Sequence, residues 1–263
     1  MRKDIRLELE KMSEENYKKF SSSLIPGITN MLGIRLPLLR EYAKKIAKGD
    51  WENAIAEEDY YFEETMLRGM VLGYTSNDVA KMQSYIEEFI PLVDNWSVCD
   101  SVFMGMKIFE KNREWAWEFI QPYLSSDKEF EIRVGVIIMM QHILKCDENG
   151  KKISRLRHIG MAELNNVNEK KGMYLDRIFE VMDKVCTKDY YASMAVSWLL
   201  TEAFCMFPYH TYKYINKNQL DAITYNKGLQ KIVESKIPDD EVNELIKGLK
   251  SKFGTINGKN LEL

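Results

Sequence analysis

The chain has 263 residues, of which 45% are hydrophobic and 29% charged, so it is long enough and apolar enough to build a substantial core. Its 37 basic and 40 acidic side chains give a formal charge of -3. This balance excludes a wholly basic, histone-like nucleic-acid binder, although it is compatible with one basic face on an acidic body.

The cysteine, histidine and hydropathy patterns argue against several further classes of protein. The four cysteines are widely separated and there are three histidines, which argues against a zinc ribbon, a disulfide scaffold and a histidine-based metal site. We therefore expect no metal and no cofactor. We find no apolar run of about 18 residues and no signal-peptide pattern, so we expect a cytoplasmic protein with no membrane contact, associated with the nucleoid when bound to DNA.

Apolar residues recur at helical spacing along most of the chain. In chain order, the pattern predicts helices over residues 4–22, Arg35–Lys48, Tyr60–Tyr74, Asn77–Ile90, a segment with Asp94 as N-cap and a stripe that reaches Phe109, Arg113–Leu124, a segment capped by Ser126 or Asp127 that ends near Lys145, and Tyr190–Phe207.

Two of these segments are apolar on almost every side, namely Val134–Met140 and the stretch around Ala195–Leu200. Such helices belong in the centre of a stack. Sustained period-2 alternation is missing, so we predict an all-α fold. Helices of this length with short polar turns favour a curved solenoid of antiparallel helix pairs, HEAT-like, with a repeat of about 40 residues. A globin-like bundle is the alternative.

We expect a single domain over residues 1–253 and a flexible tail over residues 254–263. Residues 146–172 break the helical rhythm and form a polar insertion with a short helix near Ile159–Leu164. Its lysines and arginines leave two interpretations open, a solvated loop or a mobile basic contact.

Two segments in the first half combine polar groups with apolar neighbours. Arg35 and Arg40 lie near the start of a helix, where positive charge opposes the helix dipole unless an anion is close, and Lys44 continues the basic character. An ordinary basic surface is the alternative. Trp96 and Asp100 are four residues apart and share a helix face. Because Asp100 flanks an apolar stripe, it is either a buried cap or ion-pair partner, or part of a site that stabilises positive charge.

Two further segments lie in the second half. Arg133 opens the most apolar helix, so it needs a carboxylate or phosphate partner; a structural pair with Asp100 and a phosphate clamp are both open. Trp198 is surrounded by small residues, which suits either a core position or a ligand platform.

Together, these segments resemble the AlkD family of DNA alkylation repair glycosylases, from about Tyr17 to Leu249. The resemblance depends on four motifs, which are Gly33-Ile34-Arg35-x-Pro37-x-Leu39-Arg40, Asn95-Trp96-x-x-x-Asp100, Glu131-Ile132-Arg133 and Met194-Ala195-Val196-Ser197-Trp198. The resemblance implies a HEAT-like fold and a monofunctional glycosylase that removes purines carrying a cationic alkyl group at N3 or N7 from duplex DNA.

The same resemblance implies a role for each site residue. Asp100 is the catalytic carboxylate that stabilises an oxocarbenium-like sugar, Trp96 and Trp198 lie against the sugar or the lesion, and Arg133 holds a phosphate and Asp100. The expected DNA-contacting cations are Arg35, Arg40, Lys44 and Lys227. We expect a monomer. The alternative function is a non-catalytic helical-repeat module that binds unusual DNA structures or a protein partner.

Overall fold

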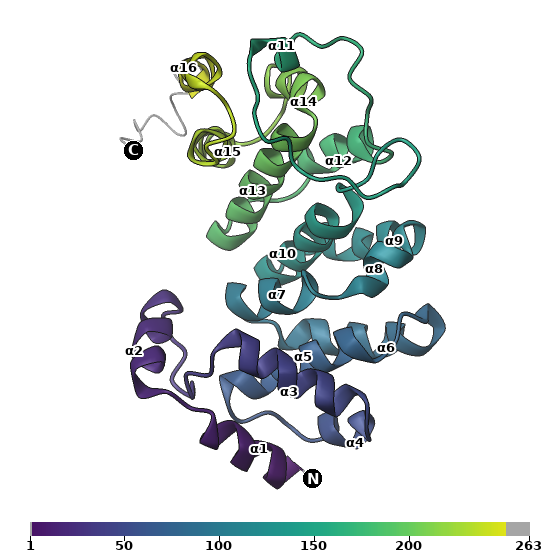
Figure 1. The fold of residues 1–263 in the computed structure, drawn as a ribbon, viewed down its shortest axis with the longest axis vertical. Helices are drawn as coiled ribbons and strands as arrows, with labels where there is room; N and C mark the ends of the chain where they lie inside the picture. Colours follow the sequence, from purple (N-terminus) through teal and green to yellow (C-terminus); the bar gives the residue numbers. More distant parts are fainter. Residues whose placement is uncertain (1, 251–263) are drawn as a thin grey trace. The chain divides into compact units, whose positions relative to one another are not determined.

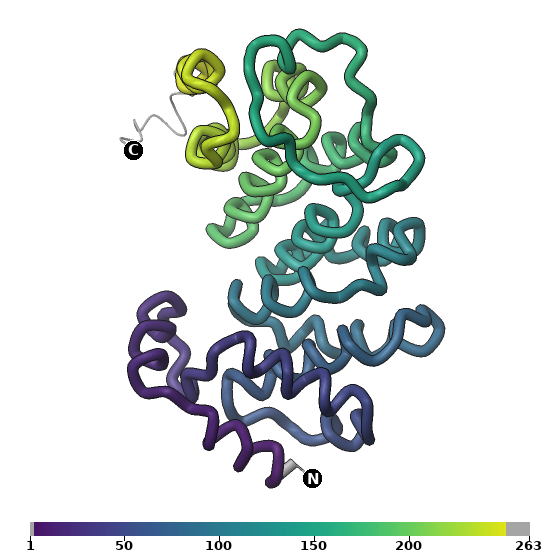
Figure 2. The backbone as a smooth tube through the Cα atoms, in the orientation of Figure 1, coloured from purple at the N-terminus to yellow at the C-terminus, as the bar shows by residue number. Residues whose placement is uncertain are grey.

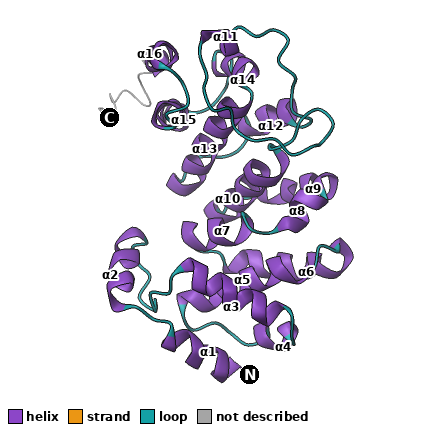
Figure 3. Ribbon diagram, viewed as in Figure 1, coloured by secondary structure: helices purple, strands orange, loops and turns teal. Residues whose placement is uncertain are grey.

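The computed structural model describes residues 2–250, and over those residues it contains helices, turns and two isolated β-bridges but no strand (Figures 1 and 3). The all-α prediction is confirmed. The predicted tail at residues 254–263 lies outside the described residues. By its internal contacts the chain divides into two compact units, Met1–Ala116 and Trp117–Leu263, and each is described by itself.

The first unit contains short and medium helices. They are α1 (Arg2–Lys11), α2 (Glu15–Leu24), α3 (Leu36–Ala47), α4 (Trp51–Ile55), α5 (Phe62–Thr75), α6 (Val79–Phe89), a 3-10 turn η1 (Ile90–Leu92), α7 (Trp96–Phe103), α8 (Lys107–Lys111) and the start of α9 (Arg113–Leu124). Helix α5 is central, because α3, α6 and α7 all pack on it (Figure 1). Gly69 permits this close approach: a Cβ atom there would lie 2.5 Å from the Phe89 ring.

Several boundaries in this unit differ from the prediction. Residues 4–22 form two helices, because the chain turns at residues 12–14. The N-cap of α7 is Asn95, one residue after the predicted Asp94, and its side-chain oxygen accepts the Val98 N–H at 2.9 Å. The stripe that reaches Phe109 is shared by α7 and α8, since the backbone turns at residues 104–106 and the apolar side chains still face one core.

The second unit is built around one long helix. It holds the rest of α9, α10 (Glu129–Ile138), a π-helical turn η2 (Met139–Ile143), α11 (Met161–Leu164), α12 (Leu175–Met182), α13 (Tyr190–Met206), α14 (Pro208–Ile215), α15 (Ala222–Glu234) and α16 (Asp240–Leu249). Helix α13 packs on α10, α14 and α15, and α15 packs on α16.

The two segments predicted to be central are buried in this unit. Val134–Met140 is buried throughout, and Ala195–Leu200 is buried except for Trp198. The π-helical turn starts at Met139, inside the segment for which a continuous helix was predicted. Packed helix pairs recur in both units, as a helical-repeat fold requires.

Residues 146–172 are integrated into the second unit rather than projecting from it (Figure 2). The Leu156 N–H donates to the Cys205 carbonyl of α13 at 2.8 Å, and the Ile159 N–H donates to the Ile237 carbonyl at 3.0 Å. Further along, the Glu169 carboxylate accepts the His210 N–H at the start of α14. The predicted short helix is present as α11, which packs on α14.

Candidate functional site

The residues singled out in the sequence are divided between the two units. Trp96, Asp100, Arg35, Arg40 and Lys44 belong to the first. Arg133, Trp198 and Lys227 belong to the second. Each group has its own local arrangement.

Trp96 and Asp100 lie one turn apart at the start of α7, and both are half-buried. The indole Nε1 of Trp96 donates a hydrogen bond to the Leu24 carbonyl at the end of α2, at 3.3 Å. The buried side of α7 carries Cys99 and Phe103, which are fully buried and fix the rotation of the helix, and Trp96 and Asp100 lie at the border of that side. Core packing therefore places the indole and the carboxylate together at the edge of the buried side of the helix, as the spacing predicts.

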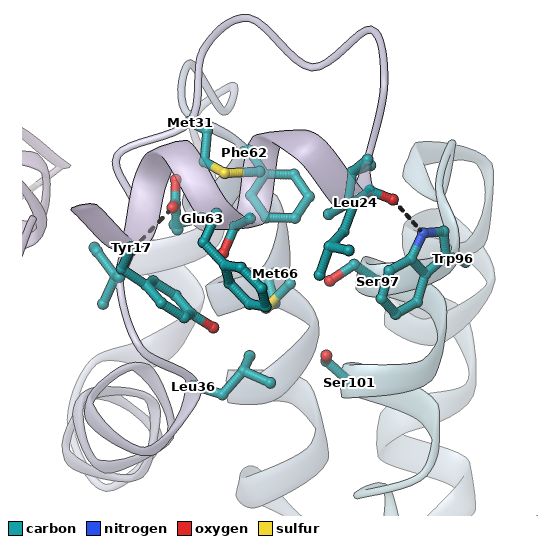
Figure 4. A pocket seen from close by; sticks show the side chains of 14 residues that line it. Tyr17, Leu24, Met31, Leu36, Phe62, Glu63, Met66, Trp96, Ser97 and Ser101 are labelled. Carbon is teal, nitrogen blue, oxygen red and sulfur yellow. Dashed lines mark hydrogen bonds between the residues drawn. The ribbon is translucent and has the colours of Figure 1, made fainter. Parts of the chain in front are cut away.

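A cavity of about 130 Å³ lies beside this face, enclosed by α2, α3, α5 and α7 (Figure 4). Trp96 borders it, and the hydroxyls of Ser97 and Ser101 come from the neighbouring face of α7. Most of the remaining lining is apolar, including Leu36 and Met66. The indole thus borders a small, largely apolar cavity, and Asp100 follows it by one helical turn.

A buried carboxylate fixes the segment that precedes α3. Glu63 on α5 is 2% exposed and accepts the backbone N–H groups of Leu32, Gly33 and Ile34 at 2.9, 2.7 and 3.2 Å. Gly33 has a φ of 82°, and a Cβ there would lie 2.5 Å from the Lys18 backbone nitrogen, so this position requires glycine. Positive charge at the start of α3 calls for a nearby anion. The buried Glu63 carboxylate is one such anion, and the protein itself provides it.

The predicted DNA-contacting cations of the first unit have intramolecular partners. Arg35 is the N-cap of α3 and donates to both carboxylate oxygens of Glu14, at 2.9 and 3.0 Å. This hydrogen-bonded pair raises the pKa of Arg35 and lowers the pKa of Glu14. Lys44 binds Glu41 at 2.8 Å, which raises the pKa of the lysine. Arg40 lies one turn before Lys44 and is half-exposed. Basic side chains do gather at α3, but two of them, Arg35 and Lys44, form ion pairs with carboxylates.

Arg133 holds two helices of the second unit together. Its side chain is on α10, is 5% exposed, and donates from Nη1 to the Tyr191 carbonyl at 2.7 Å. One turn earlier, the Glu129 carboxylate accepts the Tyr191 N–H. The sequence predicted a carboxylate or phosphate partner for this buried arginine; a backbone carbonyl of α13 is one of its partners. Arg133 thereby fixes the first turn of the helix that carries Trp198.

Trp198 is half-buried on α13, and its indole Nε1 donates to Glu202 Oε1 at 3.2 Å. Glu202 is 2% exposed and binds the Arg155 guanidinium through both carboxylate oxygens. Lys145 approaches the same carboxylate at 3.8 Å. Lys227, on α15, is half-exposed.

Sequence reasoning missed Glu202, Arg155 and Lys145. A signal for Glu202 was present, because a carboxylate four residues after Trp198 repeats the spacing of Trp96 and Asp100 and interrupts an apolar helix. Its arginine partner comes from the insertion, 47 residues earlier, and no local pattern links the two.

These features describe a helical-repeat protein with a half-buried indole and carboxylate one turn apart on a short helix, and a second indole hydrogen-bonded to a buried carboxylate that pairs with an arginine. The family model described as "DNA alkylation repair enzyme" matches residues 5–232. The match covers most of the chain, and the protein belongs to this family. Its general function is therefore DNA alkylation repair, with DNA as a partner. A comparison with curated proteins gives no match.

Residues 2–250 contain neither a membrane-spanning helix nor a metal-binding cluster. No helix in that range is long and apolar enough to cross a membrane. Nor does any cluster of three or more His, Cys, Asp or Glu side chains there have the arrangement of a metal site.

Proposed function

We propose that the protein is a DNA glycosylase that hydrolyses the N-glycosidic bond of purines alkylated at N3 or N7 in duplex DNA. The observation that carries this proposal is the α7 face, where Asp100 and Trp96 lie one turn apart, half-buried, beside the buried side of the helix. Family membership supplies the general function, and this face supplies groups suited to the reaction.

In the proposed reaction, the bond between the deoxyribose C1′ and the purine nitrogen breaks. The alkylated purine is already cationic, so it takes the bonding electron pair and leaves as a neutral base. Positive charge then develops on the sugar, and water adds to C1′ and releases a proton to solvent. A carboxylate aimed at that charge stabilises the transition state more than the ground state. Asp100 has this role and also orients the attacking water.

The aromatic and basic residues assist binding in this proposal. Trp96 and Trp198 present electron-rich ring faces to the sugar or to the cationic lesion. Arg133 supports the position of Trp198 through the first turn of α13 and contacts a phosphate. Arg35, Arg40, Lys44 and Lys227 contact the DNA backbone, which contributes affinity but no sequence readout.

The test is release of methylated bases from alkylated duplex DNA by wild-type protein and by Asp100→Asn. The substitution keeps the size of the side chain and removes its charge. We expect excision to fall about a hundredfold or more, the scale seen when a transition-state electrostatic partner is removed. Asp94→Asn is the matched control, because it removes an equal charge from an exposed residue just before α7.

DNA affinity and folding decide how a loss of excision is interpreted. An Asp100→Asn protein that stays folded, binds DNA and no longer excises supports the proposal, and one that excises normally refutes it. Unfolding would instead indicate that Asp100 is a structural ion-pair partner.

A non-catalytic module that binds unusual DNA structures or a protein is the second candidate. It is favoured by the charge of -3 and by the carboxylate partners of Arg35 and Lys44. Wild-type protein that binds duplex DNA but releases no alkylated base would select this candidate.

A further inference from the structure

One side of α2 lies over the cavity next to Trp96 instead of over a packed core. At the i, i+3, i+4 and i+7 spacing of a single helix face, α2 lines this cavity with Tyr17, Phe20, Ser21 and Leu24. Every residue of α2 is nevertheless exposed or half-buried, and Phe20 and Leu24 are 59% and 48% exposed. An apolar group that enters the cavity would therefore complete the packing of this helix.

The α7 wall of the cavity adjoins the proposed catalytic carboxylate. Trp96, Ser97 and Ser101 line the cavity from α7, and the two serine hydroxyls point into it (Figure 4). Because successive residues of an α-helix are turned by about 100°, Asp100 falls between Trp96 and Ser97 on the circumference of α7. A group bound in the cavity therefore lies beside a reaction that takes place at Asp100.

The chemistry of the lining favours an uncharged, largely apolar group. Leu36 and Met66 extend the apolar surface from α3 and α5. Glu63 also borders the cavity, but both of its carboxylate oxygens accept backbone N–H groups of the segment before α3. The groups that meet a ligand are thus apolar side chains and hydroxyls.

The size of the cavity narrows the choice of ligand. Its volume is about 130 Å³. An apolar cavity of about 150 Å³ accommodates benzene. A single six-membered ring or a short alkyl chain therefore fits, whereas the two fused rings of a purine do not.

Trp96 connects this cavity with the outside. Its indole Nε1 donates to the Leu24 carbonyl at the end of α2, at 3.3 Å, which fixes the ring at the edge of the cavity. An indole face attracts a cationic ring. A cationic purine held against Trp96 can therefore keep its ring outside while a substituent on that ring enters the cavity.

We propose that this cavity receives the alkyl group of the lesion and admits groups up to the size of a benzyl group. The inference rests on the proposed function, which supplies the alkylated purine, and it adds a limit on the size of the substituent. Ser21 is the specificity-determining position on α2, because its small side chain leaves the space that the alkyl group takes.

The experiment compares duplex DNA that has been methylated with duplex DNA that has been benzylated. Single-turnover release of the N3-alkyladenine and N7-alkylguanine is measured for wild type, Ser21→Leu and Ser23→Leu. The ratio of benzyl to methyl release is compared between proteins, so that the different leaving-group chemistry of the two lesions cancels. Ser23→Leu is the matched control, because Ser23 is exposed and two residues turn the helix by more than half a turn away from Ser21.

We expect the benzyl-to-methyl ratio of Ser21→Leu to fall about tenfold or more below that of wild type, because the leucine takes the space that the ring needs. Ser23→Leu should keep the wild-type ratio. A second measurement uses benzene itself as the probe. Benzene should raise the Tm of wild type and of Ser23→Leu but not of Ser21→Leu, since a ligand stabilises the state that binds it.

Four results would overturn the inference. A wild-type ratio in Ser21→Leu overturns it and leaves the proposed function intact where methylated bases are still released. An unchanged Tm of the wild-type protein in benzene also overturns it. Thermal protection by free N3-methyladenine that is lost in Ser21→Leu would assign the cavity to the purine ring instead. If wild-type protein releases no methylated base, the proposed function fails together with the inference.

Discussion

Glu63→Gln is predicted to destabilise the first unit and to release the segment that leads to Arg35. The Glu63 carboxylate accepts three backbone N–H groups in a position that is 2% exposed. Glutamine has the same shape but one oxygen instead of two. If that oxygen keeps the bonds to Gly33 and Ile34, the new amide group faces the Leu32 N–H, donor against donor.

The magnitude follows from those bonds. A buried N–H left without an acceptor costs about 2 kcal/mol, and conversion of a charged acceptor to a neutral one weakens each remaining bond by about 1 kcal/mol. The expected loss is therefore about 4 kcal/mol. Since domains are stable by about 5–15 kcal/mol, the change would remove a large share of the unit's stability.

Urea denaturation followed by tryptophan fluorescence measures the loss, and hydrogen exchange at Leu32, Gly33 and Ile34 locates it. Glu41→Gln is the control, because Glu41 lies exposed on α3 and forms a surface ion pair with Lys44. The control should be indistinguishable from wild type. If Glu63→Gln shows unchanged stability and unchanged exchange at the three amides, the assignment of Glu63 as the anchor of this segment is wrong.

Two further predictions concern packing and pH. Gly69→Ala should destabilise the first unit by about 1–2 kcal/mol in urea, because overpacking against the buried Phe89 ring outweighs the gain in helix propensity; a stabilised variant would contradict the close approach of α5 and α6. Burial raises the pKa of Glu169 above its usual value of 4.5. Just above pH 4.5, the folded state therefore keeps a carboxyl proton that the unfolded state loses. Wild type should therefore lose stability relative to Glu169→Gln as the pH rises from 4.5, and parallel pH profiles would refute this.

The helices could be predicted from sequence where one apolar stripe and one clear boundary coincide. The predicted range Arg113–Leu124 is exact, and the predicted Arg35–Lys48 differs from α3 by one residue at each end. Burial of Val134–Met140 followed from composition alone, since a segment without a polar face has to lie inside. These features depend on local spacing, which the sequence carries directly.

The surroundings of the site residues could not be predicted in the same way. The partner of Arg35 is Glu14, the N-cap residue of α2, and the partner of Glu202 is Arg155, in an insertion without helical periodicity. Whether a basic side chain faces solvent or forms an ion pair with a carboxylate depends on the tertiary fold. Composition therefore overestimates how much of the basic character of α3 is available to DNA.

The two Trp-x-x-x-acid pairs show why spacing alone does not assign a catalytic carboxylate. Asp100 follows Trp96, and Glu202 follows Trp198, each by one helical turn. Glu202 is 2% exposed and both of its oxygens bind Arg155, so its charge is already compensated and does not reach a ligand. Asp100 is half-buried, and the proposed function gives it the task of stabilising positive charge on a sugar. The same spacing thus occurs in two environments: a buried carboxylate that anchors a guanidinium, and a half-buried one that the proposed function sets against a developing cation, so the surroundings of each carboxylate have to be known before a role is proposed for it.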